Sequence, residues 1–596
     1  MAMRSPSRRD DEAAEETVPS TEFSVWAPDA TTVEVVVGSR RAALESGAYG
    51  WWHATVEETG PGDDYGFSVD GGDPLPDPRS ASQPNGVHGL SRLVDHDTFD
   101  WTDDLWKGAP LAGQIVYEIH VGTFTPEGTF DGAIDRLDHL VDLGATAVEV
   151  MPVAEFPGER GWGYDGVALY AVHRAYGGPN AFKRFVDECH RLGLSVILDV
   201  VYNHLGPDGN YLGSFGPYFS DAYRTPWGDA VNFDEAGSSE VRDFFIENAL
   251  YWFEHYHVDG LRLDAVHAMF DRSATHFLAE LSQRVEHLSA RLGRTLFLIA
   301  ESDLNDPRVV TPREAGGYGI DAQWSDDFHH ALHAALTGER DGYYADFGQL
   351  SQVADALSRA YVYDGVYSEF RGRHHGRRPE GLSGHRFFGY LQNHDQVGNR
   401  AQGERSSALM TPELLRIGAA LVLTSPFVPM LFQGEEWGAS TAFQYFTDHE
   451  DPGLGRAVSE GRRREFAAFG WDPEQVPDPQ DVATFRRSVL DWDEPARPPH
   501  TDLLDWHRDL IALRRAEPDL SDGRLDLVEC RFDEDERWLA VNRGSILVLC
   551  NLGDTETRIP LGEANEAEVL LRSGAVDLSG GDAVLGPAAV AVLRSS

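Results

Sequence analysis

VDGLRLDAVH, residues 258–267, is the stretch that decides the prediction of the fold, because an apolar run ends there in an arginine and a carboxylate. Three other stretches have the same form: SVILDVVYNH at 195–204, TLFLIAES at 295–302 and FGYLQNHDQVGNR at 388–400. Their carboxylates are Asp199, Asp264, Glu301 and Asp395. Acids this far apart in a chain meet where the strands of a parallel barrel end at one mouth. Acids gathered around one bond indicate glycosidic chemistry.

Eight apolar segments, separated by longer segments with helical periodicity, extend this pattern over the middle of the chain. They are IVYEIHVGTF (115–124), ATAVEVMPV (145–153), LSVILDVVYNH (194–204), VDGLRLDAVH (258–267), LFLIAES (296–302), DAQWSDDFHHA (321–331), FFGYLQNHD (387–395) and FVPMLFQGEEW (427–437). Strands that alternate with helices predict an α/β fold, the (β/α)8 TIM barrel. The four acids then follow the third, fourth, fifth and seventh strands.

Short alternating segments on both sides of the barrel predict two further domains. EFSVWAP, TVEVVVG and DYGFSVDG are separated by Gly, Pro and Asp, which is typical of an immunoglobulin-like β-sandwich. We expect a disordered lead-in at 1–20, the sandwich at 21–100, the barrel at 101–525 and a C-terminal β-domain at 526–596. Insertions at about 205–240, 338–385 and 435–495 follow barrel strands, where loops determine substrate choice.

The composition excludes several classes of function. The chain of 596 residues has a formal net charge of −48, which would repel nucleic acid over most of the surface. No apolar run is long enough to span a membrane, and the N-terminus lacks the apolar core of a secretory signal. Three cysteines without a zinc pattern fit a reducing cytoplasm. We expect a cytoplasmic protein that acts on a neutral substrate, with no nucleic acid or membrane partner.

Two of the acids have surroundings that suggest separate chemical roles. Alternation along the strand directs Arg262 and Asp264 the same way, and an adjacent arginine keeps an aspartate ionised, as a nucleophile requires. Glu301 follows the apolar run LFLIA, which favours a raised pKa and a general acid. The alternatives are a structural ion pair for Asp264 and an acid at the start of a helix for Glu301.

The remaining motifs are less specific when each is taken alone. Asn393-His394-Asp395 places a histidine where it can bond a sugar hydroxyl and an aspartate where it can stabilise a cationic ring carbon. A lone motif of this kind is more often a turn, and His204 after Asp199 is more often structural than catalytic. Their common position at the ends of barrel strands favours the functional interpretation.

These four segments resemble the four signature regions of the α-amylase family of glycoside hydrolases, over roughly residues 110–490. The resemblance implies Asp264 as nucleophile, Glu301 as general acid/base and Asp395 as stabiliser of the transition state. It also implies sugar contacts for a further set of residues, namely Arg262, His204, His394, Tyr164 and Asp165. Asp199 then supports Arg262 at the mouth of the barrel.

The loops resemble those of the trehalose-releasing members of the family more than those of its branching enzymes. The segments that carry this resemblance include RLDAVHAM, DAQWSDDFHHALH, QNHDQVGNRAQGER and LFQGEEWGASTAFQYFTDHEDPGLGRAVSEGRRREF. They add expected substrate contacts at His267, Trp324, Asp326, Asp327, His329 and Asn399. A solvated acidic loop is an alternative interpretation of the two aspartates.

The resemblance implies double displacement with retention, on the α-1,4 linkage that joins a maltooligosaccharide to a terminal trehalose. No metal or cofactor is expected, and a maltooligosyltrehalose synthase is the implied functional partner. Two alternatives remain open at this point. One is a branching or debranching activity on glycogen with the same carboxylates, and the other is a catalytically inactive glucan-binding protein.

Overall fold

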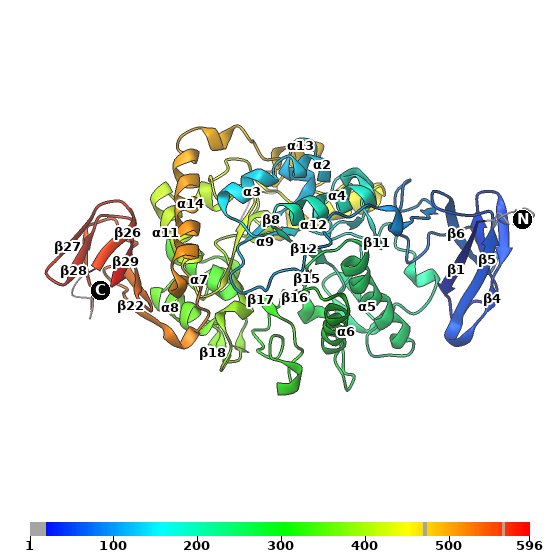
Figure 1. Ribbon diagram of the computed structural model, residues 1–596, viewed down its shortest axis with the longest axis horizontal. Helices are drawn as coiled ribbons and strands as arrows, with labels where there is room; N and C mark the ends of the chain where they lie inside the picture. Colours follow the sequence, from blue (N-terminus) through cyan, green and yellow to red (C-terminus); the bar gives the residue numbers. More distant parts are fainter. Residues whose placement is uncertain (1–18, 469–471, 473, 563–566, 596) are drawn as a thin grey trace, which may run out of the picture.

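The computed structural model describes residues 19–468, 472, 474–562 and 567–595. These residues form an N-terminal pair of sheets, a closed central barrel and a C-terminal pair of sheets. Figure 1 shows the two β-domains at opposite ends of an elongated molecule, with the barrel and its helices between them. The predicted fold class is confirmed. The lead-in predicted at 1–20 lies outside the described residues except for its last two, and the first strand begins at Ser20.

The barrel consists of eight parallel strands that close in sequence order. The strands are β8 (Val116–Ile119), β9 (Ala147–Val150), β12 (Ser195–Val200), β15 (Gly260–Leu263), β16 (Phe297–Ala300), β17 (Ala322–Trp324), β20 (Phe387–Gly389) and β21 (Val428–Phe432). Each strand lies inside one of the eight predicted segments. Buried side chains from several strands, such as Val116, Ile299 and Met430, pack together in one cluster.

Two predicted strands are wrong in their second halves, because helices begin there. β17 ends at Trp324, and α7 (Asp326–Thr337) begins two residues later. β20 ends at Gly389, and Asp395 lies in α9 (His394–Gly398). The Asn393 side chain caps this helix, since its oxygen accepts from the backbone N–H of Asp395 at 2.9 Å. The alternation expected of a strand therefore does not apply to these residues.

Helices follow the barrel strands and pack around them. The longer ones are α3 (Leu137–Leu143), α4 (Gly178–Arg191), α5 (Ser238–His255), α6 (Phe277–Leu292), α8 (Leu350–Arg359), α11 (Pro412–Leu423) and α14 (His500–Ala516). Shorter ones are α1 (Val121–Phe124), α2 (Phe130–Ile134) and α10 (Ser406–Leu409). α6 ends at Gly293 in the left-handed conformation that glycine adopts most easily (φ 63°).

The three predicted insertions carry elements of their own on the side where the strands end. The first holds the hairpin of β13 (Phe219–Thr225) and β14 (Gly228–Val231). The second holds the hairpin of β18 (Asp364–Ser368) and β19 (Arg373–Gly376), and the third holds α12 (Pro452–Ala468) and α13 (Val482–Arg487). A further short pair, β10 (Ala154–Glu155) and β11 (Ala168–Val172), follows β9.

The N-terminal domain consists of two antiparallel sheets that dock on the barrel. One contains β1 (Ser20–Trp26), β5 (Trp51–Glu57) and β4 (Glu45–Ser46). The other contains β3 (Arg40–Ala43), β2 (Val33–Val37), β6 (Asp64–Val69) and β7 (Ser91–Arg92). The indole Nε1 of Trp51 donates to the Glu240 carboxylate on α5 at 2.9 Å, and Trp26 packs edge-on against Tyr218.

The C-terminal domain also consists of two sheets. The larger contains β22 (Val528–Asp533), β23 (Trp538–Arg543), β24 (Ile546–Asn551), β29 (Ala589–Ser595) and β26 (Ala567–Ser573). The smaller contains β25 (Thr557–Pro560), β28 (Asp582–Leu585) and β27 (Val576–Ser579). Arg543 ties this domain to the barrel, because its guanidinium donates to the backbone carbonyl of Thr424 at 2.7 Å.

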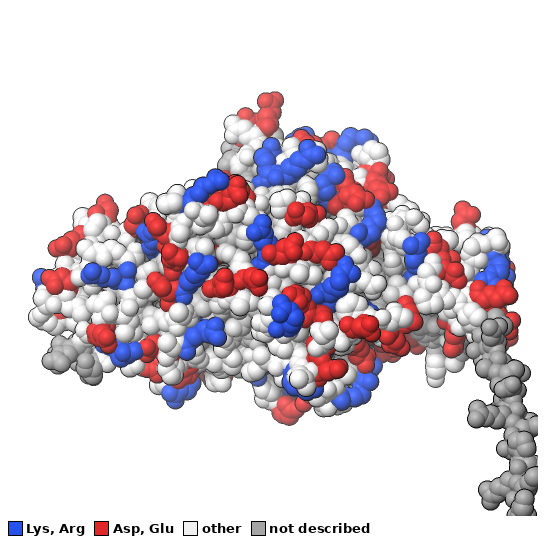
Figure 2. All heavy atoms as spheres, turned by 45° about the horizontal axis from the view of Figure 1, so that its top comes forward, with Lys and Arg blue, Asp and Glu red and all other residues white. Residues whose placement is uncertain are grey.

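The surface carries both acidic and basic side chains. Figure 2 shows acidic and basic side chains interspersed over one face of the molecule, although the net charge of the chain is −48. Of the described residues, none belongs to a helix that is long and apolar enough to cross a membrane.

Candidate active site

A cavity of about 540 Å³ lies where the barrel strands end, and it is lined by residues from the loops that follow them. Nine of the predicted site residues line it: Tyr164, Asp165, His204, Asp264, His267, Glu301, Asp326, Asp395 and Asn399. The cavity combines both halves of the predicted active site, since the three acids assigned to catalysis meet there with residues assigned to the sugar. Its volume is in the range of pockets that hold small organic ligands.

Arg262 organises the acids from beneath the cavity. It is fully buried, and its Nη1 donates to Asp199 at 2.7 Å and to Asp264 at 2.9 Å. Its Nη2 donates to Glu301 at 3.0 Å. One guanidinium therefore holds Asp264 and Glu301, the predicted nucleophile and acid/base, side by side, and a retaining mechanism requires two carboxyl groups ~5 Å apart. The predicted supporting role of Asp199 is confirmed by its bond to Arg262.

The carboxylate of Asp264 is held on both of its oxygens. Arg262 binds Oδ1, and the side-chain amide of Asn203 donates to Oδ2 at 2.9 Å. These bonds leave Asp264 with little freedom, although 7% of the residue remains exposed toward the cavity. Charge-assisted bonds of this kind are short and directional, and they fix the orientation of the carboxylate.

Glu301 is positioned by a strained turn in the chain. Ala265 has a φ of 39°, a left-handed conformation that is unfavourable for a residue with a Cβ. This turn directs the backbone N–H of Ala265 to the Glu301 Oε2 at 2.9 Å. Burial raises the pKa of Glu301, and the Asp264 charge adds to the rise, while Arg262 opposes it. A raised pKa suits a group that must hold a proton before it donates it.

Asp395 lies beside the buried side chain of His394. His394 Nε2 is 3.4 Å from the Asp395 carboxylate, and its Nδ1 bonds Glu118. Burial lowers the pKa of His394, but the Asp395 and Glu118 carboxylates outweigh burial and raise it to about 9. The Nε2 atom also forms a hydrogen bond of 2.8 Å with the Tyr164 hydroxyl, and this hydroxyl donates to Asp199 at 2.5 Å. The wall around Asp395 is thus a connected polar network.

Five predicted sugar contacts do not line the cavity in this structure. Arg262 and His394 lie directly beneath it, with no exposed surface. Trp324 is also buried, because its ring packs under the Arg262 guanidinium at 4.1 Å, and it supports the arginine instead of stacking on a sugar.

Asp327 and His329 point away from the cavity because they belong to helix α7, not to a strand. The Asp327 carboxylate accepts from the backbone N–H groups of Val362 and Tyr363, each at 2.7 Å. The ring of His329 bonds the Leu391 carbonyl and the Tyr344 hydroxyl, each at 2.8 Å. Both side chains therefore form hydrogen bonds within the protein and do not face a substrate. On the same helix, Asp326 does line the cavity.

The insertions contribute cavity residues that the sequence did not indicate. Trp227, from the turn between β13 and β14, stacks on His204 with ring centroids 4.7 Å apart. Arg371 reaches Asp303 from the β18–β19 turn and donates to it at 2.8 Å. Further missed residues that line the cavity are Trp162, His330, Tyr343, Gln396, Tyr445 and Arg462. The aromatic and arginine residues of these loops were the available signal in the sequence, but loops have no period that gives the direction of a side chain.

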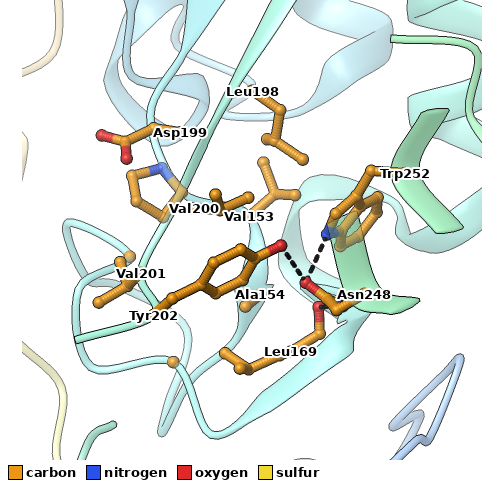
Figure 3. A pocket seen from close by; sticks show the side chains of 13 residues that line it. Val153, Ala154, Leu169, Leu198, Asp199, Val200, Val201, Tyr202, Asn248 and Trp252 are labelled. Carbon is orange, nitrogen blue, oxygen red and sulfur yellow. Dashed lines mark hydrogen bonds between the residues drawn. The ribbon is translucent and has the colours of Figure 1, made fainter. Parts of the chain in front are cut away.

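A second, smaller cavity lies behind β12 and does not compete for the substrate. Figure 3 shows the Tyr202 hydroxyl and the Trp252 indole both bonded to the Asn248 side chain there, at 2.6 and 3.1 Å. The Asp199 carboxylate points away from this trio. The space of about 10 Å³ is too small for a sugar. It belongs to the packing of β12 against α5.

The barrel and the three acids in one cleft define a glycoside hydrolase of the α-amylase class. In agreement, the family model "Alpha amylase, catalytic domain" matches residues 81–227. "Carbohydrate-binding module 48 (Isoamylase N-terminal domain)" matches residues 11–84, and "Domain of unknown function (DUF3459)" matches residues 523–592. The resemblance inferred from the signature segments is therefore confirmed at the level of the class.

Similar proteins indicate which family of the α-amylase class includes this chain. The malto-oligosyltrehalose trehalohydrolase of Arthrobacter ramosus is 54% identical over 90% of this chain and 94% of that protein. That of Saccharolobus solfataricus is 48% identical over 83% of this chain and 85% of that protein. The chain belongs to the malto-oligosyltrehalose trehalohydrolase family. A crystal structure of an alpha amylase from Salmonella typhimurium, 38% identical, covers 96% of this chain and 98% of its own with a TM-score of 0.89.

Proposed function

We propose that the chain is a retaining glycoside hydrolase that cleaves the α-1,4-glucosidic linkage next to the terminal trehalose unit of maltooligosyltrehalose. The products are trehalose and a maltooligosaccharide. The observation that carries this proposal is the pairing of Asp264 and Glu301 on one guanidinium in the cleft. The names of relatives with 44–54% identity over most of the chain support the choice of substrate.

The first chemical step forms a covalent glycosyl ester. The Asp264 carboxylate attacks the anomeric carbon, while Glu301 gives its proton to the oxygen that leaves with trehalose. The bond from the anomeric carbon to that oxygen breaks as the ester bond forms. The neighbouring Arg262 holds the Asp264 carboxylate in place, and burial raises the pKa of Glu301, which favours its protonated form.

The second step regenerates the free enzyme. Glu301, now ionised, takes a proton from water, and the water oxygen replaces Asp264 at the anomeric carbon. Asp395 faces the cavity beside His394 and stabilises the positive charge of both transition states. Two inversions at one carbon retain the α configuration in the maltooligosaccharide that is released.

The cavity wall supplies groups for the sugar rings. Tyr164 and the stacked pair of His204 and Trp227 offer ring faces, and Asp165, His267 and Asn399 offer polar groups for hydroxyls. Asp326 lies near Glu301, where burial and the Glu301 charge raise its pKa to about 8. A protonated Asp326 can donate a hydrogen bond to a sugar oxygen. We assign these residues to substrate binding.

Two wider assignments follow from the composition and the substrate. We place the protein in the cytoplasm, in agreement with three cysteines that form no disulfide among the described residues. We also assign it a functional partnership with a maltooligosyltrehalose synthase, because its substrate must first be made from a maltooligosaccharide.

A glycogen-branching activity is the alternative to test, because the same acids can transfer as well as hydrolyse. The 1,4-alpha-glucan branching enzyme of Bacillus caldolyticus is 33% identical over 51% of this chain. We expect that incubation with maltotriosyltrehalose releases trehalose and maltotriose, separated by ion-exchange chromatography, while amylose gains no α-1,6 branches. Intact maltotriosyltrehalose together with branched amylose would overturn the proposal.

A further inference from the structure

Glu118 has a contact pattern that the mechanism above does not use. It lies on β8 inside the barrel and is 1% exposed, so it touches no substrate. One carboxylate oxygen accepts from the backbone N–H of His394 at 3.1 Å, and the other bonds Nδ1 of the same residue. A single side chain thus binds both the main chain and the ring of the histidine next to Asp395.

The hydrogen bonds of the His394 ring indicate which of its nitrogen atoms carry a proton. The Tyr164 hydroxyl donates its one proton to Asp199, and therefore it accepts from His394 Nε2. Since Nδ1 faces a carboxylate, which only accepts, both ring nitrogens carry a proton. The chain of bonds is Glu118, His394, Tyr164, Asp199 and Arg262, and Arg262 ends on Asp264 and Glu301.

We propose that Glu118 is a positioning residue, which holds His394 as a fixed cation beside Asp395 and so connects the barrel interior to the reacting acids. The inference rests on the proposed function, because the acids in question are those of that reaction. Glutamine cannot replace the carboxylate, since its amide has one accepting oxygen for two donors. The –NH2 group would face either the His394 backbone N–H or a ring nitrogen that must then give up its proton.

Other titratable and charged groups surround the histidine. Those that face it are Glu149 on β9, Asp199 on β12, Arg262 on β15, His120 after β8, Tyr164 after β9 and Asp395 on its own helix. Two carboxylates, Glu118 and Asp395, are the largest influences that favour the cation, and they raise the pKa of His394 to about 9. Removal of the Glu118 charge leaves burial and Arg262 to oppose the cation, and the pKa must fall.

The test uses α-maltosyl fluoride as the substrate. Fluoride leaves without a proton from Glu301, so the loss of the Glu301 proton at high pH does not limit the first step. The second step needs Glu301 ionised and is favoured at high pH. Turnover of the fluoride by the unmodified protein is therefore expected to fall as Asp326 loses its proton near pH 8 and again as His394 loses its proton near pH 9, and only the second fall depends on Glu118. In Glu118→Gln the second fall moves to lower pH by at least one unit, whereas Glu118→Asp, which keeps the charge, stays close to the unmodified protein.

Glu149 offers a matched control in the same layer of the barrel. It lies opposite Glu118 in the register of β8 and β9, is 1% exposed, and has no hydrogen-bond partner for either oxygen among the described residues. Burial raises the pKa of Glu149 well above its usual range, and neither of its oxygens bonds His394, so Glu149→Gln changes a buried carboxyl without removing a hydrogen bond to the histidine. This variant is expected to keep the fall near pH 9. Equal shifts in both glutamine variants, or none in Glu118→Gln, would overturn the proposal.

A second measurement does not depend on turnover. Because the pKa of His394 is raised in the folded state, its contribution to stability is complete below about pH 6.5 and is lost as the pH rises to about 9. The melting temperature of the unmodified protein is therefore expected to decline over this interval, with a smaller decline in Glu118→Gln than in Glu118→Asp, which keeps the charge beside His394. Equal declines in the two variants would contradict the proposal even if no trehalose is released from maltotriosyltrehalose.

Discussion

Asp264→Asn is expected to lower kcat for maltotriosyltrehalose by about 10⁴-fold or more, because the reaction loses its nucleophile. The amide oxygen can still accept from Arg262, and the Asn203 side chain can turn to pair with the amide nitrogen. The fold should therefore survive the change. The measurement is trehalose release at saturating substrate, together with a thermal melt.

The matched control for this variant is Asp131→Asn. Asp131 pairs with Arg184, does not line the cavity, and has a side chain that is 62% exposed. It undergoes the same chemical change and should keep full activity. If Asp264→Asn keeps more than about one hundredth of kcat while folded, Asp264 is not the nucleophile.

Glu301→Gln is expected to reduce trehalose release by about 10³- to 10⁴-fold, because the leaving oxygen receives no proton. The first step with α-maltosyl fluoride should survive, since this substrate needs no general acid. Azide, a nucleophile that needs no base, should then restore turnover and yield α-maltosyl azide. The measurement is the release of fluoride with and without azide.

Glu127→Gln is the control for that variant. Glu127 is exposed and does not line the cavity, so the substitution should change neither substrate nor azide dependence. Equal loss of activity on both substrates in Glu301→Gln, without rescue by azide, would show that Glu301 does not act as the acid/base.

The barrel could be predicted from the sequence because its strands are apolar runs that end in charged residues. Arg262 on β15 and Asp264 directly after this strand lie side by side as expected, since the arginine donates to the aspartate. The prediction failed where a helix begins early, as at Asp326, since a change from a period of two to one of 3.6 reverses the direction of the next side chains. Asp327 and His329 were misplaced for this reason.

Other parts of the site depend on contacts between distant segments. Trp227 reaches His204 from a hairpin, and Arg371 reaches Asp303 from another, and neither hairpin has a pattern that fixes its direction. The left-handed turn at Ala265 is held by the bond of its backbone N–H to Glu301. The residue types around Ala265 therefore do not predict this turn. The role proposed for Glu118 also depends on a distant contact, because its partner His394 lies far from it in the chain.

The most direct test of the account is a proton NMR time course of maltotriosyltrehalose with the unmodified protein. It identifies both the bond that is cut and the configuration of the new end. The account predicts trehalose together with maltotriose whose reducing end appears first as the α anomer and equilibrates to β only afterwards. A β anomer at the earliest times, or glucose and maltose without trehalose, would contradict it.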